Sequence, residues 1–556
     1  MESLGLTLLL ALVAALALGA LAQRLRLPPM IGYIAAGLLV GPGTPGPIAD
    51  REEILALADI GVALLMFSIG LQFSLAEIRS VGPRILLGTP VQVAITMALG
   101  TGVGLLLGWE LAEALFIAGA VSVCSTVVLV KIAGEGALHT TASGRTAMGV
   151  SIVQDVVTVV LVVALPAVGG DEEATTLTLI GTAAIALGFV AFMLLAGSRI
   201  LPRVLGVVAR LRSRELFVIG VAVVAIGTAF AASALGVSVA LGAFVAGLAL
   251  ADSDLTASVL GEIVPLRELF STFFFVSIGI LLDPVSIIDG WPIVLALLLI
   301  ITLGKAVPIA VIARIDGQLP SSAARAGALV GQSGEFSFVL ASAGLALAAV
   351  RPETFSLAMG AVVISILTAQ PLLVAATRIG TVLDSRVRAT RDVDGDGMAD
   401  DQHGLRRHAV ILGYGRVGRA VARALESRGF GWVAVESDYE VARDGRRGGG
   451  RVIYGEAGSP SVLDRDGVEQ CHTVVVAMAD ALATRQAVAH TRARNPRAEI
   501  VARAASEHEE SELRRLGVAR VVVAEREVGN ELLRHALRRF GVSDREAAAI
   551  LERRRS

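Results

Sequence analysis

Long apolar segments follow one another through the first 380 residues of this 556-residue chain, and they constrain its fold more than any other feature. Several of them are long enough to cross the hydrocarbon core of a bilayer as a helix. Hydrophobic residues make up 54% of the sequence and its mean hydropathy is +0.72, which excludes an ordinary soluble protein. The residues from 381 onward are densely charged instead. The chain therefore combines a polytopic α-helical membrane part with a water-soluble part.

Thirteen apolar segments are predicted in the membrane part, or twelve if one of the two short segments, the second or the ninth, is re-entrant. Their approximate ranges are 4–22, 29–41, 53–71, 83–107, 112–131, 144–168, 175–200, 215–234, 236–251, 264–282, 290–314, 321–348 and 354–378. Lys and Arg collect in alternate loops, while Asp and Glu collect in the others. This bias predicts an N-terminus outside and a C-terminus in the cytoplasm.

One predicted span carries a carboxylate near its middle. The apolar stretch from Ala147 to Pro166 contains Gln154 and Asp155. A carboxylate at that depth costs several kcal/mol unless it has a partner or a water-filled cavity, so its default interpretation is an ion or proton site. Asp155 is therefore the first candidate for the working residue.

Two other spans contain small and polar residues at similar depth. These are the stretches Ser122–Thr126 in the fifth segment and Gly331–Glu335 in the twelfth. Both predict broken helices, which in inverted-repeat transporters expose backbone carbonyls and helix ends to an ion. Segments four to six and eleven to thirteen would then be the paired units. The alternative is that Ser and Thr bond back to the preceding turn and that Gly permits close helix packing.

Two further charged residues lie inside predicted spans. Lys305 is too deep in the eleventh segment to reach the interface, which predicts an intramembrane pair with Asp155 that a cation exchanges. Glu335 either faces a cytoplasmic funnel or caps the second broken helix.

The soluble part contains a nucleotide-binding pattern. An apolar strand leads into Gly413, Gly415 and Gly418, a helix follows, and Glu436 ends the next strand. A G-x-G-x-x-G turn in this context is a good dinucleotide fingerprint, in which the glycines admit a diphosphate and the acid holds ribose hydroxyls. The alternative is a Rossmann fold with a purely structural role. Later strands are expected at 451–454, 473–477, 500–503 and 519–523, with the strand ends at 454–457 and 477–480 closing the pocket.

These patterns predict four regions: a membrane domain over 1–380, a charged acidic linker over 381–405, a nucleotide-binding domain over 406–527 and a helical tail over 528–556. In the linker, Asp392, Asp394 and Asp396 resemble the start of a Ca²⁺ loop. The twelfth position is His403 where such a loop has Glu, so a solvated linker is favoured and a Ca²⁺ switch is the alternative.

The membrane motifs together resemble the Kef-type branch of the monovalent cation:proton antiporters. The resemblance rests on the span around Asp155, the two polar breaks and the stretch 273–280, and it covers nearly the whole chain. It implies two inverted repeats with two crossing unwound helices beside Asp155, which would alternately carry H⁺ and either K⁺ or Na⁺, with K⁺ favoured. It also implies that a lysine approaches Asp155 when no cation is bound. The residues that would form this site are Asp155, Gln154, Ser125, Thr126, Ser333, Lys305 and Glu335.

The soluble part resembles an RCK (regulator of potassium conductance) domain of the type attached to potassium transporters. This implies a regulatory nucleotide, AMP or NAD(H), and pairing into a homodimer. The positions that carry over are Gly413, Gly415, Gly418 and Glu436, with Arg503 as a phosphate candidate. One departure is that the loop 252–262 lacks the His found in glutathione-gated members, so the resemblance does not extend to glutathione gating.

Two rival classes fit less well. A nucleotide-gated channel predicts a filter such as Thr-Val-Gly-Tyr-Gly, which the sequence lacks. A membrane-bound NAD-dependent oxidoreductase would need a substrate domain and an acid/base pair, and neither follows the fingerprint. We therefore expect a transporter of the inner (plasma) membrane and not an enzyme, with no catalytic residues and no nucleic-acid partner.

Overall fold

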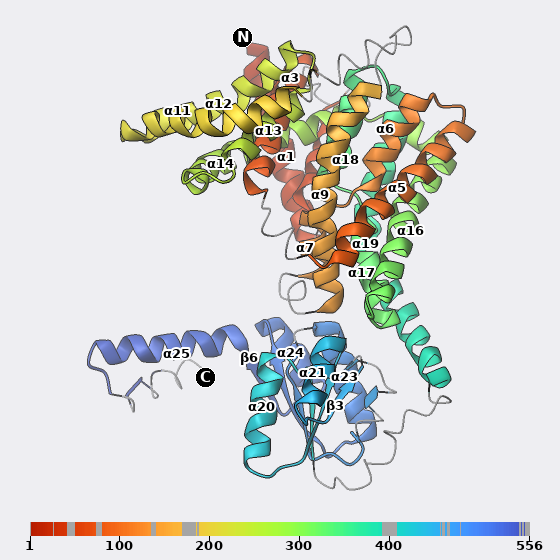
Figure 1. Ribbon diagram of the computed structural model, residues 1–556, viewed down its shortest axis with the longest axis vertical. Coiled ribbons are helices and arrows are strands. Elements are labelled where there is room, and N and C mark those ends of the chain that lie inside the picture. The colour runs from red at the N-terminus through yellow and green to blue at the C-terminus, as the bar shows by residue number, and fades with distance from the viewer. Residues whose placement is uncertain are drawn as a thin grey trace. The chain divides into compact units, whose positions relative to one another are not determined.

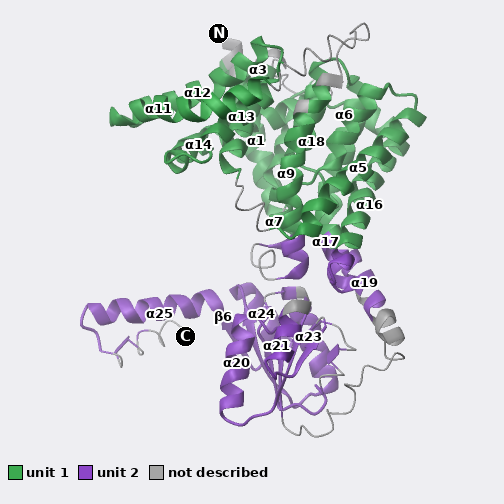
Figure 2. Ribbon diagram, in the orientation of Figure 1, with its two compact units in different colours: residues 1–132, 147–312, 327–373 green, residues 133–146, 313–326, 374–556 purple. Residues whose placement is uncertain are grey.

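The computed structural model describes residues 2–25, 27–41, 51–73, 81–134, 141–168, 185, 188–391, 408–455, 457–458, 462–463, 467–478, 480–543, 546–547 and 550. The chain divides into two compact units, which Figure 2 distinguishes by colour. The first contains residues 1–132, 147–312 and 327–373, and the second contains 133–146, 313–326 and 374–556.

Helices make up most of the described part of the chain up to residue 391 (Figure 1). In chain order they are α1 (Glu2–Arg24), α2 (Pro29–Val40), α3 (Arg51–Gln72), α5 (Pro83–Leu106), α6 (Leu111–Ser122), α7 (Thr126–Ala133), α9 (Ala142–Val168), the π-helical turn η1 (Met193–Gly197), α11 (Ser198–Arg210), α12 (Arg214–Ala234), α13 (Val239–Leu250), α14 (Thr256–Leu281), α15 (Pro284–Asp289), α16 (Trp291–Ile315), α17 (Pro320–Val330), α18 (Glu335–Ala346) and α19 (Pro352–Arg391).

The helices have the lengths that membrane spans require. In the described part of the chain, ten are long and apolar enough to cross a membrane, and three shorter apolar helices accompany them. Two of the shorter ones, α2 and α13, correspond to the second and ninth predicted segments, which are as short as the sequence indicates. A polytopic helical membrane part is therefore confirmed, while the total of thirteen spans stays a prediction.

Both predicted helix breaks are present. In the fifth segment α6 ends at Ser122 and α7 begins at Thr126; in the twelfth, α17 ends at Val330 and α18 begins at Glu335. Each broken pair follows one long helix, α5 or α16, and precedes another, α9 or α19. The same order of helix, broken helix and helix thus occurs twice along the chain, as paired repeats require.

Two helices extend further than the apolar pattern predicts. The seventh segment is expected to end near residue 200, but α11 continues through Arg210; α19 continues through Arg391, into the region predicted as linker. Hydropathy marks where a helix leaves the apolar core and not where it ends. Arginine is a good helix former, so a helix can continue past the end of its apolar run.

Glycines bring one group of helices into backbone contact. A Cβ on Gly37 of α2 would lie 1.9 Å from the carbonyl oxygen of Val276, and one on Gly279 of α14 would lie 2.0 Å from a backbone oxygen of α2. Gly70 of α3 and Gly247 of α13 meet the facing backbone in the same way. Small residues permit this approach in membranes, where packing and not hydrophobicity drives helix association.

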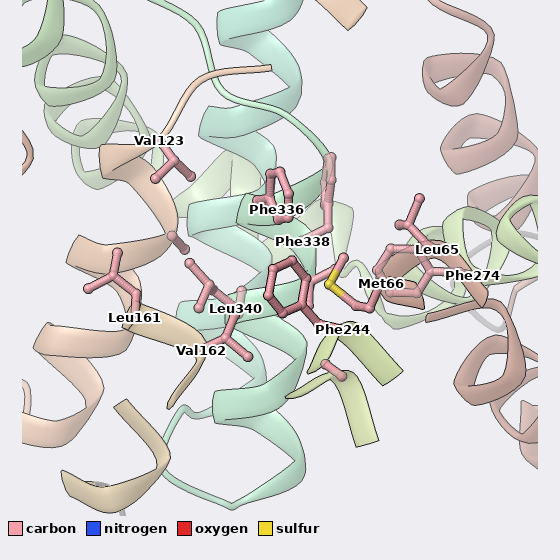
Figure 3. Close-up of a cluster of buried hydrophobic side chains, with 14 of the residues drawn as sticks. Leu65, Met66, Val123, Leu161, Val162, Phe244, Phe274, Phe336, Phe338 and Leu340 are labelled. Atoms are coloured by element: carbon pink, nitrogen blue, oxygen red, sulfur yellow. The ribbon is translucent and has the colours of Figure 1, made fainter. Parts of the chain in front are cut away.

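A continuous apolar core lies beside the broken helices. Figure 3 shows Phe336, Phe338 and Leu340 of α18 among side chains of α9, α13 and α3, including Leu161 and Phe244. The second half of the twelfth segment is therefore surrounded by packed side chains. Polar backbone at the nearby break must find its partners within the protein.

The second unit contains a parallel six-stranded sheet of order β3-β2-β1-β4-β5-β6. Its strands are β1 (Ala409–Leu412), β2 (Trp432–Glu436), β3 (Val452–Tyr454), β4 (Thr473–Val476), β5 (Glu499–Ala504) and β6 (Arg520–Val523). Its helices are α20 (Arg416–Ser427), α21 (Tyr439–Arg447), α23 (Ala481–Arg494), α24 (Glu507–Arg515) and α25 (Ala524–Arg539). The strand order is that of a Rossmann fold, and all six predicted strands are confirmed. The order reverses between β1 and β4, where such folds bind ligands.

Candidate functional site

The two breaks meet although Ser125 and Gln332 are 207 residues apart in sequence. The side chain of Gln332 donates from Nε2 to the Ser125 carbonyl oxygen at 2.9 Å, and its Oε1 accepts from the Ser125 backbone nitrogen at 3.3 Å. A Cβ on Gly334 would lie 2.1 Å from the Cβ of Ser125, so only glycine allows this approach. One amide side chain thus replaces the helical hydrogen bonds that the first break gives up.

Lys305 joins the two breaks from a third helix, α16. Its Nζ donates to the carbonyl oxygens of Val123 at 2.9 Å and Gln332 at 2.6 Å, and to the hydroxyl of Ser333 at 3.0 Å. These contacts use all three ammonium donors of a side chain that is 0% exposed. Val123 and Gln332 follow closely on the C-terminal ends of α6 and α17, where helices carry partial negative charge. The ammonium therefore compensates both helix ends.

The predicted ion pair between Lys305 and Asp155 is not formed in this structure. Among the residues that the structure describes, none donates a hydrogen bond to the Asp155 carboxylate or forms an ion pair with it. The physical reason is that the lysine is already satisfied by the unwound backbone. Asp155 is partly buried in α9, so its carboxylate remains available to a ligand.

The neighbour of Asp155 faces the protein interior. Gln154 is completely buried, and its Oε1 accepts from the backbone nitrogen of Cys124 at 2.7 Å. One turn earlier in α9, the hydroxyl of Ser151 lies 2.6 Å from that of Thr126, the first residue of α7. The first break is thus attached to α9 at both ends of the turn that leads to Asp155.

Glu335 links the N-terminal end of α18 to the other break. Its Oε2 accepts from the hydroxyl of Ser125 at 2.7 Å. A carboxylate in the first turn is stabilised by the positive end of the helix. Glu335 is the first residue of α18, where this stabilisation acts, and its two predicted roles, facing a cytoplasmic funnel or capping the helix, stay predictions.

Sequence reasoning misses two buried amide side chains, Gln332 and Gln92. The first stands within the predicted second break, where nothing in the sequence distinguishes it from its neighbours. The second is a fully buried residue of α5 whose Oε1 accepts from Nε2 of Gln154 at 2.6 Å. The rule that identifies Asp155, a polar side chain deep within an apolar span, could have found Gln92 as well.

The second unit contains a cavity of about 890 Å³ at the carboxyl ends of the strands. Gly413 and Gly415 line it, and the three glycines of the turn have distinct roles. Gly413 has a φ of +98°, which favours glycine; a Cβ on Gly415 would meet no atom within 4 Å; a Cβ on Gly418 would lie 1.9 Å from the Gly413 carbonyl oxygen. The turn is therefore tight, open toward the cavity and closely packed on its strand, as a diphosphate-binding turn requires.

Glu436 lies at the mouth of this turn. Its Oε2 accepts from the backbone nitrogen of Tyr414 at 2.8 Å, and its Oε1 accepts from that of Asp438 at 2.9 Å. Arg503 of β5 and Arg416 in the first turn of α20 also line the cavity. An acidic group near the turn and cations around it provide acceptors for ribose hydroxyls and donors for phosphate.

The remaining predicted pocket segments also contribute. Ala457, Ala477 and Asp480 line the cavity, as expected from the two strand ends. Arg325 of α17, which belongs to the same compact unit, donates from Nη1 to Oδ2 of Asp480 at 3.0 Å. A side chain from the first half of the twelfth segment is thus part of the cavity wall.

The linker candidates Asp392, Asp394 and Asp396 lie outside the described residues. Within the part that is described, no group of three or more His, Cys, Asp or Glu side chains is placed to hold a metal ion.

Residues 8–375, more than half of the chain, match the family described as sodium/hydrogen exchanger, transmembrane. The chain belongs to the sodium/hydrogen exchanger family. Residues 409–524 match the TrkA-N domain, which covers the six-stranded sheet. The predicted Kef-type architecture, an antiporter domain followed by a nucleotide-binding domain, is confirmed.

Relatives match this exchanger over most of its length. The putative cation/proton antiporter YbaL of Escherichia coli is 34% identical, with 94% of this chain and 95% of the relative covered. The putative K(+) efflux antiporter KefB of Alkalimonas amylolytica is 29% identical, with 96% of this chain and 81% of the relative covered. The sodium proton antiporter MjNhaP1 of Methanocaldococcus jannaschii has a TM-score of 0.50 at 16% identity, covers 67% of this chain and 97% of its own, and supports the fold. All three relatives are named as antiporters.

Proposed function

We propose that the chain exchanges a monovalent cation for H⁺ across the membrane, with K⁺ favoured over Na⁺, and that Asp155 is the shared binding site. The observation that carries the proposal is a membrane-helix carboxylate that has no hydrogen-bond or ion-pair partner among the described residues. It lies near two helix breaks that contact each other and whose helix ends Lys305 already satisfies. The efflux antiporter of Alkalimonas amylolytica, named for K⁺, supports the choice of ion.

Competition at one carboxylate accounts for exchange. A proton neutralises Asp155 and leaves no charge to hold a cation, whereas the ionised form attracts one. Because Lys305 is held by backbone carbonyls, the cation need not displace an ammonium from Asp155 in this arrangement. Access to the two sides would alternate as the helices around the breaks move past the glycine-packed group of α2, α3, α13 and α14, whose backbone contacts make it rigid.

The residues around Asp155 would line the cation path. Ser125, Thr126 and Ser333 supply hydroxyls, and Gln154 supplies an amide that anchors the first break. Glu335 adds a negative charge at the N-terminal end of α18. Oxygen ligands and nearby negative charge are what a desolvated monovalent cation requires.

The soluble domain would regulate exchange by binding a nucleotide, AMP or NAD(H). The turn at Gly413 to Gly418, with Glu436 and Arg503, supports a phosphate and a ribose in the cavity. Arg325, which bonds to Asp480 in the cavity wall, lies in α17, and this helix ends where the second break begins. A nucleotide that favours one position of Arg325 would bias the arrangement of the break, since a ligand acts only through its differential affinity.

The protein would lie in the inner (plasma) membrane as a homodimer, with its N-terminus outside and its soluble domain in the cytoplasm. The distribution of Lys and Arg over alternate loops supports this orientation.

Proton flux into proteoliposomes tests the proposal. Purified protein and Asp155→Asn are compared after addition of K⁺ or Na⁺, with AMP or NADH present and absent. We expect a cation-driven pH change that the variant lacks, larger with K⁺, and altered by nucleotide. A channel would let the cation move down its gradient without driving protons uphill, so cation flux without proton flux would overturn the proposal.

A further inference from the structure

Gln92 is a completely buried amide in α5 that contacts both the first break and α9. Its Oε1 accepts from Gln154 of α9 at 2.6 Å, and its Nε2 donates to Thr96 Oγ1 at 3.0 Å and toward the Ser122 carbonyl oxygen at 3.4 Å. Ser122 is the last residue of α6, where a carbonyl lacks an intrahelical partner. Gln92 therefore contacts the first break and the neighbour of Asp155 at once.

A continuous series of hydrogen bonds runs through Gln92 toward α16, the helix that carries Lys305. The backbone nitrogen of Cys124 donates to Gln154, Gln154 donates to Gln92, and Gln92 donates to Thr96. The hydroxyl of Thr96 lies 2.9 Å from the carbonyl oxygen of Gly304, the residue before Lys305 in α16, and 3.0 Å from that of Gln92, and these two oxygens share its one proton. This series of hydrogen bonds connects the first break with α9, which carries Asp155, and with α16, which carries Lys305.

The direction of this series of hydrogen bonds is fixed by its first member. A backbone N–H only donates, so the side-chain atom of Gln154 that faces Cys124 is its oxygen. Its amide nitrogen then faces Gln92, whose oxygen must accept, and the nitrogen of Gln92 is directed toward Thr96 and Ser122. Neither amide can reverse without placing two donors face to face in the buried interior, which leaves both unsatisfied.

We propose that Gln92 is a positioning residue for cation binding at Asp155. Gln92 holds Gln154 in one orientation. Because Gln154 precedes Asp155 in α9, Gln92 thereby fixes the position of the Asp155 turn relative to the first break and to α16, the helix that carries Lys305. This inference rests on the proposed exchange at Asp155. It adds a residue that contacts neither ion nor nucleotide but determines the affinity of the site.

The distinguishing variant is Gln92→Glu, compared with Gln92→Leu. A protonated glutamic acid has one oxygen that accepts from Gln154 and one hydroxyl that donates to Thr96, so it reproduces the amide. The ionised form loses the donor and adds a charge beside the site. Leucine has a similar size but neither function. Thr89→Val is the matched control, because Thr89 is a buried hydroxyl of the same helix that, among the described residues, bonds back to Ile85 of its own turn.

The experiment measures the KM for K⁺ and the maximal exchange rate of each variant between about pH 6 and 8.5, at equal amounts of folded protein. For Gln92→Leu we expect a KM raised about 10- to 100-fold at every pH, the size of effect seen when a partner of a ligating residue is removed. For Gln92→Glu we expect near-wild-type KM at the acidic end and a progressive rise relative to wild type as the pH increases. Thr89→Val should keep the wild-type KM.

Two results overturn the inference while leaving the exchange proposal standing. One is wild-type KM in folded Gln92→Leu; the other is a Gln92→Glu defect that does not change with pH relative to wild type. Failure of the exchange proposal looks different, since wild type itself would then show no Asp155-dependent exchange. A second readout, the thermal stabilisation of purified protein by K⁺, follows the same order of variants and reports binding without transport.

Discussion

Replacing glycine by alanine at two positions of the nucleotide turn, Gly415 and Gly418, distinguishes an effect on ligand binding from an effect on folding. In Gly415→Ala the new methyl group meets no atom within 4 Å, and the φ of −71° suits any residue, so the domain should fold as wild type does. The methyl group projects into the space through which a diphosphate approaches the backbone. We expect nucleotide affinity to fall at least 10-fold, about 1.4 kcal/mol.

Gly418→Ala should instead lower the stability of the domain. Its methyl group would lie 1.9 Å from the Gly413 carbonyl oxygen and 2.9 Å from its carbonyl carbon, so α20 must shift away from β1. Overpacking of this kind costs about 1–3 kcal/mol because backbone, unlike a side chain, cannot rotate out of the way. That cost corresponds to a decrease of roughly 2–12 °C in the unfolding temperature of a domain of this size.

The assay is calorimetric titration of purified full-length protein with AMP and NADH, together with thermal unfolding of the same samples. Wild-type affinity in folded Gly415→Ala would refute the placement of the phosphates against the turn. An unchanged unfolding temperature in Gly418→Ala would refute the close packing of α20 on the strand.

Three further outcomes follow from single contacts. Gly279→Ala places a methyl group against the backbone of α2 and should lower the unfolding temperature in detergent, whereas Gly261→Ala in the same helix, with open space around it, should not. Hydrogen bonding from Arg526 lowers the pKa of the Glu510 carboxyl, so the contribution of this carboxyl to stability is complete above the ordinary glutamate value of about 4.5 and is lost as the pH falls through the lower folded-state value. The unfolding temperature of Glu510→Gln should therefore vary less with pH in that acidic range than that of wild type. A pH dependence equal to that of wild type would contradict this. Arg325→Gln should reduce the ratio of exchange rates with and without nucleotide, and a wild-type ratio would exclude the coupling route through α17.

The soluble domain could be predicted from the sequence almost strand by strand. Strands of a parallel sheet are buried on both faces, so they read as short apolar runs between turns, and β1 and β2 show this pattern. The glycine turn carries its own geometric requirements, which are visible in the spacing of Gly413, Gly415 and Gly418.

The breaks in the membrane part could also be predicted, but their partners could not. Ser and Gly clusters in apolar spans indicate unwound backbone, and the structure has it at both places. The partners of Lys305 include carbonyl oxygens of residues 27 and 182 positions away. Any residue type presents a carbonyl, so the sequence offers no signal for them, and a carboxylate such as Asp155 is the natural but wrong choice in this structure.

The role of Gln92 could not be predicted from the sequence either. Its position in an apolar span is visible in the sequence, yet its importance depends on the facing Gln154 and on the direction of a hydrogen-bonded chain. Such direction follows only from three-dimensional contacts with a backbone N–H, here that of Cys124. Helix ends are hard to predict for a different reason, because the apolar run of α11 stops before the helix does at Arg210.

If one carboxylate, that of Asp155, binds either H⁺ or the cation, then binding of the cation must release protons, and these can be counted. Purified protein in detergent is titrated calorimetrically with K⁺ and with Na⁺ in two buffers of different ionisation enthalpy. Each titration is run at two pH values, a lower one at which exchange is slow and a higher one at which it is fast. We expect K⁺ binding to release protons in wild type at the lower pH, and Asp155→Asn to show neither binding nor release. Cation binding without proton release, or release that persists in Asp155→Asn, would contradict it.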